Sequence, residues 1–211
     1  MGDEDFLWMK DYLQLNGLVY KLVPLKAEKG TDNHPLYMGS VDADRMYGTV
    51  MNWDWGNMGS DKIYHDPQTR RNSIQYRINL SRLAEKLIQE DKLEKAINIA
   101  DLAMTNMPLQ HYGYYQLVDP FVEVYYQVGQ KQKARTLIDQ LAVKYQEKLN
   151  YYKGFNLPEQ NEYAMDIMKE IETYRQMILL AEPTDKEYFQ KLAADFTTYN
   201  AFFKRFERPE L

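Results

Sequence analysis

The sequence predicts a mainly α-helical protein whose helices fold back on one another in antiparallel pairs. Residues 77–108 show this most clearly, because two short amphipathic segments in this stretch are joined by a polar turn. Pro108 ends the second segment, since proline lacks the N–H group that would continue a helix. Small side chains recur where two helix backbones would approach closely, namely at Ala84, Ala96, Ala100 and Ala103.

The spacing of these residues agrees with a tetratricopeptide repeat, a helix pair of about 34 residues. Counted from Arg77, small residues stand at the 8th, 20th and 27th positions and proline stands at the 32nd. A second copy, aligned on Ala134, has drifted from the pattern at its later alanine and proline positions. We therefore expect tetratricopeptide-like antiparallel helical hairpins that form an α-α superhelix. The alternative is a plain helical hairpin with an alanine-rich seam.

Three regions are expected along the chain. Residues 1–66 would be an irregular region with short helices, one strand and a loop that contains two tryptophans. Residues 67–152 would form two tetratricopeptide-like hairpins. Residues 153–211 would form a capping pair of helices, because the last unit of a repeat array must cover the exposed end of the core.

The first elements are predicted from breaks in the N-terminal sequence. Residues 4–15 predict a short helix that Asn16 and Gly17 end. Residues 18–23 then predict a strand that Pro24 closes. A single strand needs a partner, and the sequence shows no convincing second strand nearby. Its partner would be missing from this chain, or the strand would lie extended across the helices.

The next helices are predicted from their capping residues. Residues 26–40 are rich in Gly, Pro, Asn and Asp and predict a loop. Asp42 predicts the N-cap of a helix that ends near Asn52. Asp66 and Pro67 predict the start of the long helix that becomes the first repeat helix, since proline suits the first helical turn.

The remaining helices are separated by further breaks. Helices over residues 110–129 and 131–152 would form the second hairpin. The segment Gly-Phe-Asn-Leu-Pro at 154–158 interrupts the chain. Two more helices, at 159–181 and 185–206, would then be separated by Glu-Pro-Thr.

Composition limits the classes of function. The chain has 211 residues, a net charge of −5 and a pI of about 5.3, which argues against nucleic acid as a partner because phosphate binding needs a basic surface. It contains no cysteine, so disulfides and thiolate metal sites are excluded. No apolar run reaches the roughly 18–20 residues that span a bilayer, and the acidic start of the chain does not resemble a signal peptide.

The sequence predicts no catalytic residue, no cofactor and no metal site. His34, His65 and His111 are widely separated and lack the close spacing of common metal-ligand sets. Phosphate-binding glycine loops and nucleophile elbows are absent. Acid pairs such as Asp42 and Asp44 are better explained by helix capping and solvation than by acid–base catalysis.

Trp53, Trp55 and Asn57 are the first candidates for a binding site. Aromatic faces stack on sugar rings or on peptide side chains, and nearby carboxylate and amide groups supply directional hydrogen bonds. We therefore hypothesise that this loop forms one wall of a binding groove. The alternative is that both tryptophans pin an irregular loop onto the helices.

Tyr115 and Tyr126 are the second pair of candidates. Tyr115 falls on the inner helix of the second repeat, and inner helices of such arrays line a concave face that binds extended peptides. Tyr126 lies one residue beyond a core position and could point into that face. The alternative is that these tyrosines belong to the core, in which case burial of Tyr126 would remove it from the groove.

Five stretches of the sequence resemble the soluble tail of a bacterial membrane-protein family, the protein O-mannosyltransferase-like family with a domain of unknown function. Members carry a multi-pass membrane region first and a tetratricopeptide-like tail after it. The resemblance covers most of residues 5–152. The stretches that resemble the tail are 12–24, Asp44-Arg45-Met46-Tyr47, Trp55-Gly56-Asn57, 77–106 and Leu149-Asn150-Tyr151-Tyr152.

The resemblance implies an accessory domain on the exported, periplasmic side of the inner membrane, attached to the membrane only through the absent N-terminal region. Any glycosyltransferase activity would then belong to that region, and this fragment would not be an enzyme. We expect a non-catalytic interaction domain that binds a protein or peptide partner. The alternatives are a carbohydrate-binding module that presents glycan or acceptor to the membrane enzyme and, for location, the cytoplasm.

Overall fold

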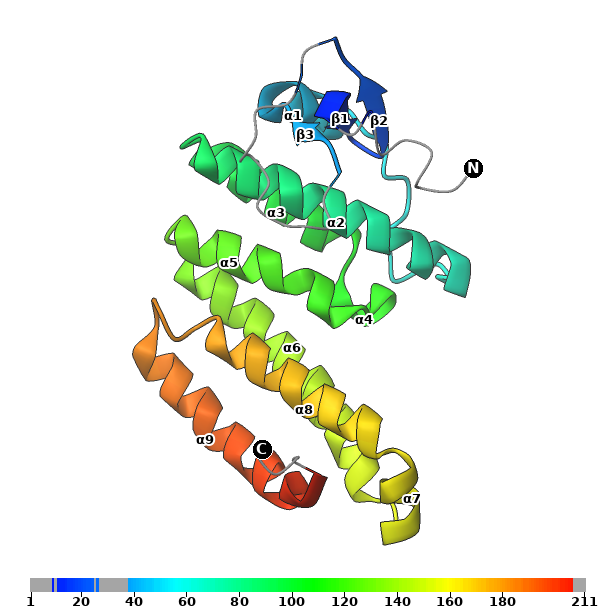
Figure 1. Ribbon diagram of the computed structural model, residues 1–211, viewed down its shortest axis with the longest axis vertical. Helices are drawn as coiled ribbons and strands as arrows, with labels where there is room; N and C mark the ends of the chain where they lie inside the picture. The colour runs from blue at the N-terminus through cyan, green and yellow to red at the C-terminus, as the bar shows by residue number, and fades with distance from the viewer. Residues whose placement is uncertain (1–8, 10, 25, 27–37, 207–211) are drawn as a thin grey trace. The chain divides into compact units, whose positions relative to one another are not determined.

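The computed structural model describes residues 9, 11–24, 26 and 38–206 of the chain. It confirms the predicted mainly α-helical fold and also contains a small sheet near the N-terminus (Figure 1). The chain divides into two compact units, Met1–Val128 and Gly129–Leu211, called here the N-terminal unit and the C-terminal unit. The division into three regions at residues 66 and 152 stays a prediction.

The sheet of the N-terminal unit has three strands in the order β2-β1-β3. Strands β1 (Leu13–Asn16) and β2 (Val19–Leu22) run antiparallel, with Leu13 opposite Leu22 and Asn16 opposite Val19. Strand β3 (Ser40–Val41) pairs in parallel with β1 on its other side. The prediction of one unpartnered strand was therefore wrong.

The error came from the Asn16-Gly17 pair. Gly17 is the first of two residues that join β1 to β2, and its φ of 71° is the backbone conformation that glycine supplies in a type II′ hairpin turn. The same pair is also typical of the end of a helix, because glycine with positive φ ends helices as well. Residues 13–16 are a strand and not helix; residues 4–8 and 10 of the predicted helix lie outside the described residues.

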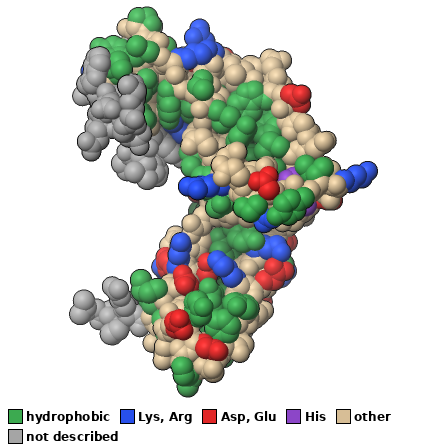
Figure 2. Space-filling view, turned by 90° about the vertical axis from the view of Figure 1, so that its right-hand side faces the viewer, with side chains coloured by type: hydrophobic (Ala, Val, Ile, Leu, Met, Phe, Trp, Pro, Cys, Tyr) green, Lys and Arg blue, Asp and Glu red, His purple; other side chains and the backbone are tan. Residues whose placement is uncertain are grey.

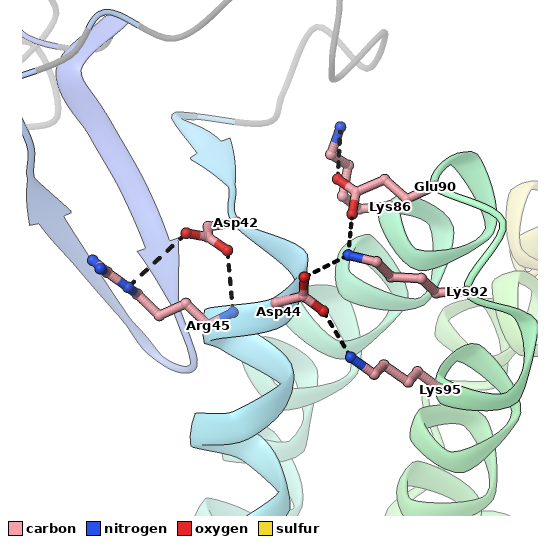
Figure 3. Close-up of polar contacts among 7 residues, drawn as sticks. All are labelled: Asp42, Asp44, Arg45, Lys86, Glu90, Lys92 and Lys95. Carbon is pink, nitrogen blue, oxygen red and sulfur yellow. Dashed lines mark hydrogen bonds and ion pairs between the residues drawn. The ribbon is translucent and has the colours of Figure 1, made fainter.

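Helix α1 (Ala43–Met51) begins as predicted, with the Asp42 side chain accepting a hydrogen bond from the backbone N–H of Arg45. Asp44, in the first turn, forms ion pairs of 2.7 Å with both Lys92 and Lys95 (Figure 3). Hydrogen bonds from these two lysines lower the pKa of the Asp44 carboxyl to about 2. The start of α1 is thus linked to the start of helix α3 (Leu93–Asn106).

Helices α2 (Pro67–Gln89) and α3 (Leu93–Asn106) pack against each other as the predicted helical hairpin. Asp66 caps α2 as predicted, because its carboxylate accepts from the backbone N–H groups of Gln68 and Thr69. The helix after the turn ends before Pro108, also as predicted. The seam alanines are fully buried: Ala84, Ala96, Ala100 and Ala103. Tetratricopeptide-like packing of this hairpin stays a prediction.

Polar side chains of α2 hold the sheet against the helix. Asn79 donates a hydrogen bond of 2.8 Å to the carbonyl of Gly17 in the hairpin turn. Arg82 donates to the hydroxyl of Tyr20 at 3.1 Å and to the carbonyl of Gly39 at 3.0 Å. Both side chains are buried, although asparagine and arginine are mostly exposed in folded proteins.

The predicted helix 110–129 is interrupted in the structure. Helix α4 (Leu109–Tyr112), the 3₁₀ helix η2 (Tyr115–Val118) and helix α5 (Asp119–Gln127) replace it. The interruption falls at Gly113 and Tyr114, which both have positive φ values and so cannot continue a right-handed helix. Helix α5 packs on α2 and α3.

Asp119, at the start of α5, places a carboxyl group in a buried position. Its Oδ1 atom has no hydrogen-bond partner among the described residues. Burial, together with a smaller effect of the nearby Glu123 carboxylate, raises the pKa of the Asp119 carboxyl to about 7. The folded chain therefore keeps a proton that the unfolded chain releases near pH 4, and stability is lost as the pH rises from about 4 to about 7.

We expect Asp119→Asn to raise the free energy of unfolding at about pH 8 by on the order of 1–3 kcal/mol and to have little effect near pH 4. The gain is reduced because the ionised carboxylate interacts favourably with the N-terminus of α5. Urea denaturation at both pH values measures the difference. Glu94→Gln is the matched control, because Glu94 occupies the first turn of α3 but is exposed. A gain that is equal at the two pH values would contradict the burial argument.

The C-terminal unit contains helices α6 (Lys131–Lys153), α7 (Leu157–Glu162), α8 (Ala164–Leu179) and α9 (Lys186–Phe203), followed by the 3₁₀ helix η3 (Lys204–Phe206). Helix α8 packs against α6, α7 and α9. The predicted break at 182–184 is confirmed, and the break predicted at 154–158 is shorter than expected, because Leu157 and Pro158 already belong to α7. The predicted single helix 159–181 is instead broken at Tyr163.

Polar and aromatic contacts join these helices. The Arg135 guanidinium donates to both carboxylate oxygens of Asp185, at 2.7 and 2.8 Å. The ring of Tyr145 stacks on that of Tyr174, with centroids 5.6 Å apart. None of the helices in the described part of the chain combines the length and the apolar character needed to cross a membrane.

Candidate binding groove

Three aromatic side chains of the N-terminal unit form a corner on its surface. Ring centroids lie 5.4 Å apart for Trp53 and Trp55, and 5.6 Å from each tryptophan to Tyr76. The three rings meet at interplanar angles of 61°, 76° and 52°, so no two of them are coplanar. All three side chains are half-buried, which leaves part of each ring available for contact.

The corner is positioned by α1, α2 and the β-hairpin. The backbone N–H of Trp53 donates to the carbonyl of Val50, so this residue directly continues the end of α1. Its indole lies against the hairpin turn, where a Cβ added to Gly17 would be only 2.7 Å from Cζ2 of Trp53. Tyr76 is fixed by α2. The hairpin turn at Gly17 therefore supports one wall of the site.

Two hollows meet at this corner, and we call them together the aromatic groove. The smaller has a volume of about 180 Å³ and contains the aromatic corner. The larger has a volume of about 600 Å³ and follows α2 towards its N-terminus. Leu18 and Tyr76 line both hollows. The smaller is also lined by Trp53, Asp54, Trp55 and Met58, and the larger by Gln68, Arg71, Asn72, Ile74 and Gln75.

The floor of the larger hollow is one face of α2. Gln68, Asn72, Gln75 and Tyr76 recur at intervals of four, three and one residues, which places them along one side of a helix. Asn79 continues this face but is covered by the hairpin turn through its bond to Gly17. The sheet thus covers the later part of the α2 face, and no described residue covers the earlier part, which forms the groove.

The loop that carries the tryptophans is also held by contacts with the segment that follows α3. The Tyr112 hydroxyl donates to the carbonyl of Met58 at 2.9 Å. His65 is buried, its ring stacks on that of His111 with centroids 4.5 Å apart, and His111 contacts Asp61 at 2.7 Å. Figure 2 shows histidine side chains in purple close to an acidic side chain in red. The loop is therefore held on both sides of the aromatic corner.

One donor in the corner has no acceptor. The indole N–H of Trp55 is buried and makes no hydrogen bond within the described part of the chain. An unsatisfied buried donor costs about 1–3 kcal/mol. The position of Trp55 is thus less favourable for stability than its ring contacts alone would indicate.

Only two of the five predicted site residues line the aromatic groove in the structure. Trp53 and Trp55 line the groove. Asn57 is exposed and does not line it; its carbonyl accepts the backbone N–H of Ser60 in a turn. Tyr115 is half-buried in η2 and is not part of the groove. Tyr126 is only 7% exposed, so it does not line an open surface and we do not retain it as a groove residue.

Sequence reasoning missed several residues that define the site. Leu18 was assigned to an unpartnered strand, and Arg71 and Tyr76 were not singled out on α2. The predicted start of that helix at Asp66 could have placed Arg71 and Tyr76 on its face by helical spacing. The contact of His65 with His111 had no local signal. Among the described residues, no group of three or more His, Asp or Glu is arranged to hold a metal ion.

Comparison with known families gives one partial match. Residues 1–45 match the model of the family described as TMEM260-associated domain 2. The matched stretch contains all three strands and the hairpin turn on which Trp53 packs. No curated protein and no solved structure matches the chain in the corresponding comparisons.

Proposed function

We propose that this chain is a non-catalytic binding module that holds an extended segment of a protein partner in the aromatic groove. The observation that supports this most directly is the aromatic corner next to a face of α2 that no other described segment covers. Aromatic side chains contribute much of the energy at protein interfaces, where they fill or form apolar pockets. The amide side chains of Gln68, Asn72 and Gln75 beside them can pair with peptide groups of an extended chain.

The shape of the corner favours a peptide over a sugar. A sugar ring stacks best on a flat aromatic face, whereas Trp53, Trp55 and Tyr76 meet at steep angles and form a concave corner. Such a corner suits an apolar side chain that inserts between rings. Leu18, Met58 and Ile74 add apolar lining. The row of amides alongside the aromatics favours the second candidate, a carbohydrate-binding module, because planar polar groups also bind sugar hydroxyls.

The proposed context is the exported side of a longer membrane protein that resembles the protein O-mannosyltransferase-like family. The sequence resemblance over residues 5–152 supports this proposal. The family that matches residues 1–45 is described as associated with TMEM260, which agrees with an accessory part of a larger protein. In this proposal the chain binds a partner or acceptor, and chemistry takes place in another region.

Trp55→Ala is expected to weaken partner binding by about 30-fold, because a tryptophan at the centre of an interface is the type of residue on which affinity depends most. The thermal midpoint should stay within about 5 °C, since the ring is half-buried and its buried N–H is unsatisfied. Binding to arrayed heptapeptides and to arrayed glycans measures the first effect, and circular dichroism measures the second.

Tyr64→Ala is the control for this experiment, because Tyr64 lies in the same loop and is 78% exposed but does not line the groove. This variant should bind as the parent chain does. Glycan binding that depends on Trp55 without any peptide binding would favour the carbohydrate alternative. Unfolding of Trp55→Ala at ordinary temperature would mean that the tryptophan serves the core instead of a binding site.

A further inference from the structure

We propose that the aromatic groove selects a partner segment with an acidic side chain next to an aromatic or large apolar one, and that Arg71 binds the carboxylate. This inference rests on the proposed function and adds the chemistry of the ligand. The aromatic corner accounts for the apolar side chain. The larger hollow of the groove, along α2, accounts for the acidic one.

Arg71 is an exposed cation without a partner within the described part of the chain. No hydrogen bond, ion pair or cation–π contact of its side chain occurs there. Its neighbour Arg70 is different, because its Nε–H donates to the carbonyl of His65 at 2.8 Å and helps fix the loop. The Arg71 guanidinium therefore remains available for a ligand, and a planar guanidinium binds a carboxylate through two parallel hydrogen bonds.

The larger hollow contains no acidic side chain that would compete for Arg71. The acidic residue in the smaller hollow is Asp54, whose Oδ1 accepts from the backbone N–H of Gly56. Asp66, near the start of α2, is also engaged, because its carboxylate caps the helix and accepts from the Thr69 hydroxyl. The larger hollow thus has a local positive charge although the chain as a whole carries a net charge of −5.

Helix geometry sets the spacing of the ligand. Arg71 and Tyr76 are five residues apart, which places them roughly 7.5 Å apart along the helix axis at a rise of 1.5 Å per residue. An extended peptide advances about 3.3 Å per residue, so this distance corresponds to about two peptide residues. Side chains two residues apart in an extended chain point to the same side. Arg71 and Tyr76 are also about 140° apart around the helix, so they flank the groove from opposite sides and the helical rise sets only their spacing along it. A glutamate two residues from a tryptophan matches that spacing along the groove.

The test uses two synthetic heptapeptides that are identical except for one position. Both contain tryptophan, and the residue two positions before it is glutamate in one and glutamine in the other. Fluorescence anisotropy measures their affinity for the 211-residue chain at low (~20 mM) and high (~300 mM) salt. We expect the glutamate peptide to bind about five- to tenfold more tightly at low salt, with a smaller difference at high salt.

Arg71→Gln should abolish this preference by weakening the glutamate peptide alone, and Arg71→Lys should retain part of it because lysine keeps the charge but not the fork of donors. Arg175→Gln is the matched control, since it removes the same charge from an exposed pair with Glu172 outside the groove. Equal affinity of the parent chain for both peptides, or an equal loss of both in Arg71→Gln, would overturn the proposal for Arg71.

The two proposals can fail separately. If both peptides bind, Trp55→Ala weakens both and neither is preferred, the groove is a peptide site and the assignment of Arg71 is wrong. If neither peptide binds, the groove is not a peptide site and both proposals are overturned. Arg71-dependent binding of a glucuronic acid oligosaccharide without peptide binding would assign the cation to an acidic glycan and overturn the peptide assignment.

Discussion

Replacing Arg77 by methionine is expected to lower the free energy of unfolding of the N-terminal unit by about 2–4 kcal/mol. Arg77 is fully buried in α2, and its guanidinium donates to the carbonyls of Met107 at 2.7 Å, Gly113 and Tyr114. Burial lowers the pKa of Arg77 to about 10, so the group is still charged at neutral pH. Methionine fills the volume but leaves these carbonyls without their donor.

The carbonyls belong to the segment that leads from α3 to α5. This segment cannot satisfy them within a continuous helix, because Gly113 and Tyr114 have positive φ values. One side chain from α2 thus replaces the hydrogen bonds that the interrupted helix lacks. Arg77→Lys should recover part of the stability, since lysine keeps the charge but has fewer donors in a different geometry.

Urea unfolding followed by tryptophan fluorescence measures the effect, because all three tryptophans of the chain lie in residues 1–128. Hydrogen exchange of residues 107–118 should increase most. A loss below about 1 kcal/mol would show that water or a rearranged backbone satisfies these carbonyls without Arg77. Exposed Arg45, which forms only a 3.9 Å ion pair with Asp42, provides the control substitution Arg45→Met.

The parts of the fold that could be predicted from the sequence are those with local causes. Asp42 and Asp66 cap their helices through hydrogen bonds to residues two or three positions away, and Pro108 prevents a helix from continuing. The contacts of the seam alanines are also between residues close in sequence, since α2 and α3 are joined by a short turn. Each of these features depends on residues that are close in sequence, so their patterns are visible without the fold.

The parts that could not be predicted depend on contacts between distant residues. The Asn16-Gly17 pair is compatible with a helix end and with a hairpin turn, and the choice is made by the contact of the turn with Trp53 and Asn79. Arg77 has the composition of a solvent-exposed helix position, yet it is fully buried. A helical period shows which residues share a face, but not which polar residues on that face find partners elsewhere.

The candidate site was predicted only in part, because several of its residues are distant from one another in sequence. Trp53 and Trp55 are large aromatics in an irregular loop, a pattern visible in sequence. Tyr76 and Leu18 complete the corner from α2 and the hairpin, 21 and 37 residues away from Trp55 in sequence. Only the fold brings these three segments together. The groove therefore depends on the sheet staying docked on α2, and this dependence leads to the second prediction.

Arg82→Met is expected to release the sheet from α2 and to cost about 2–4 kcal/mol. Arg82 is 1% exposed and donates to the Tyr20 hydroxyl and to the carbonyls of Met38 and Gly39, so it links β2 and the start of β3 to the helix. A three-stranded sheet of this size has little stability of its own. Its amides should therefore lose protection while the hairpin of α2 and α3 remains folded.

Hydrogen exchange with mass spectrometry separates the two arginines. Arg82→Met should increase exchange in residues 13–22 more than in residues 93–106, and it should weaken peptide binding because Leu18 and the support of Trp53 are lost with the hairpin. Arg77→Met should instead affect residues 107–118 first. If Arg82→Met unfolded α3 as readily as the sheet, the sheet and the helical hairpin would form a single cooperative unit. The sheet could then not be released from the groove without unfolding α2.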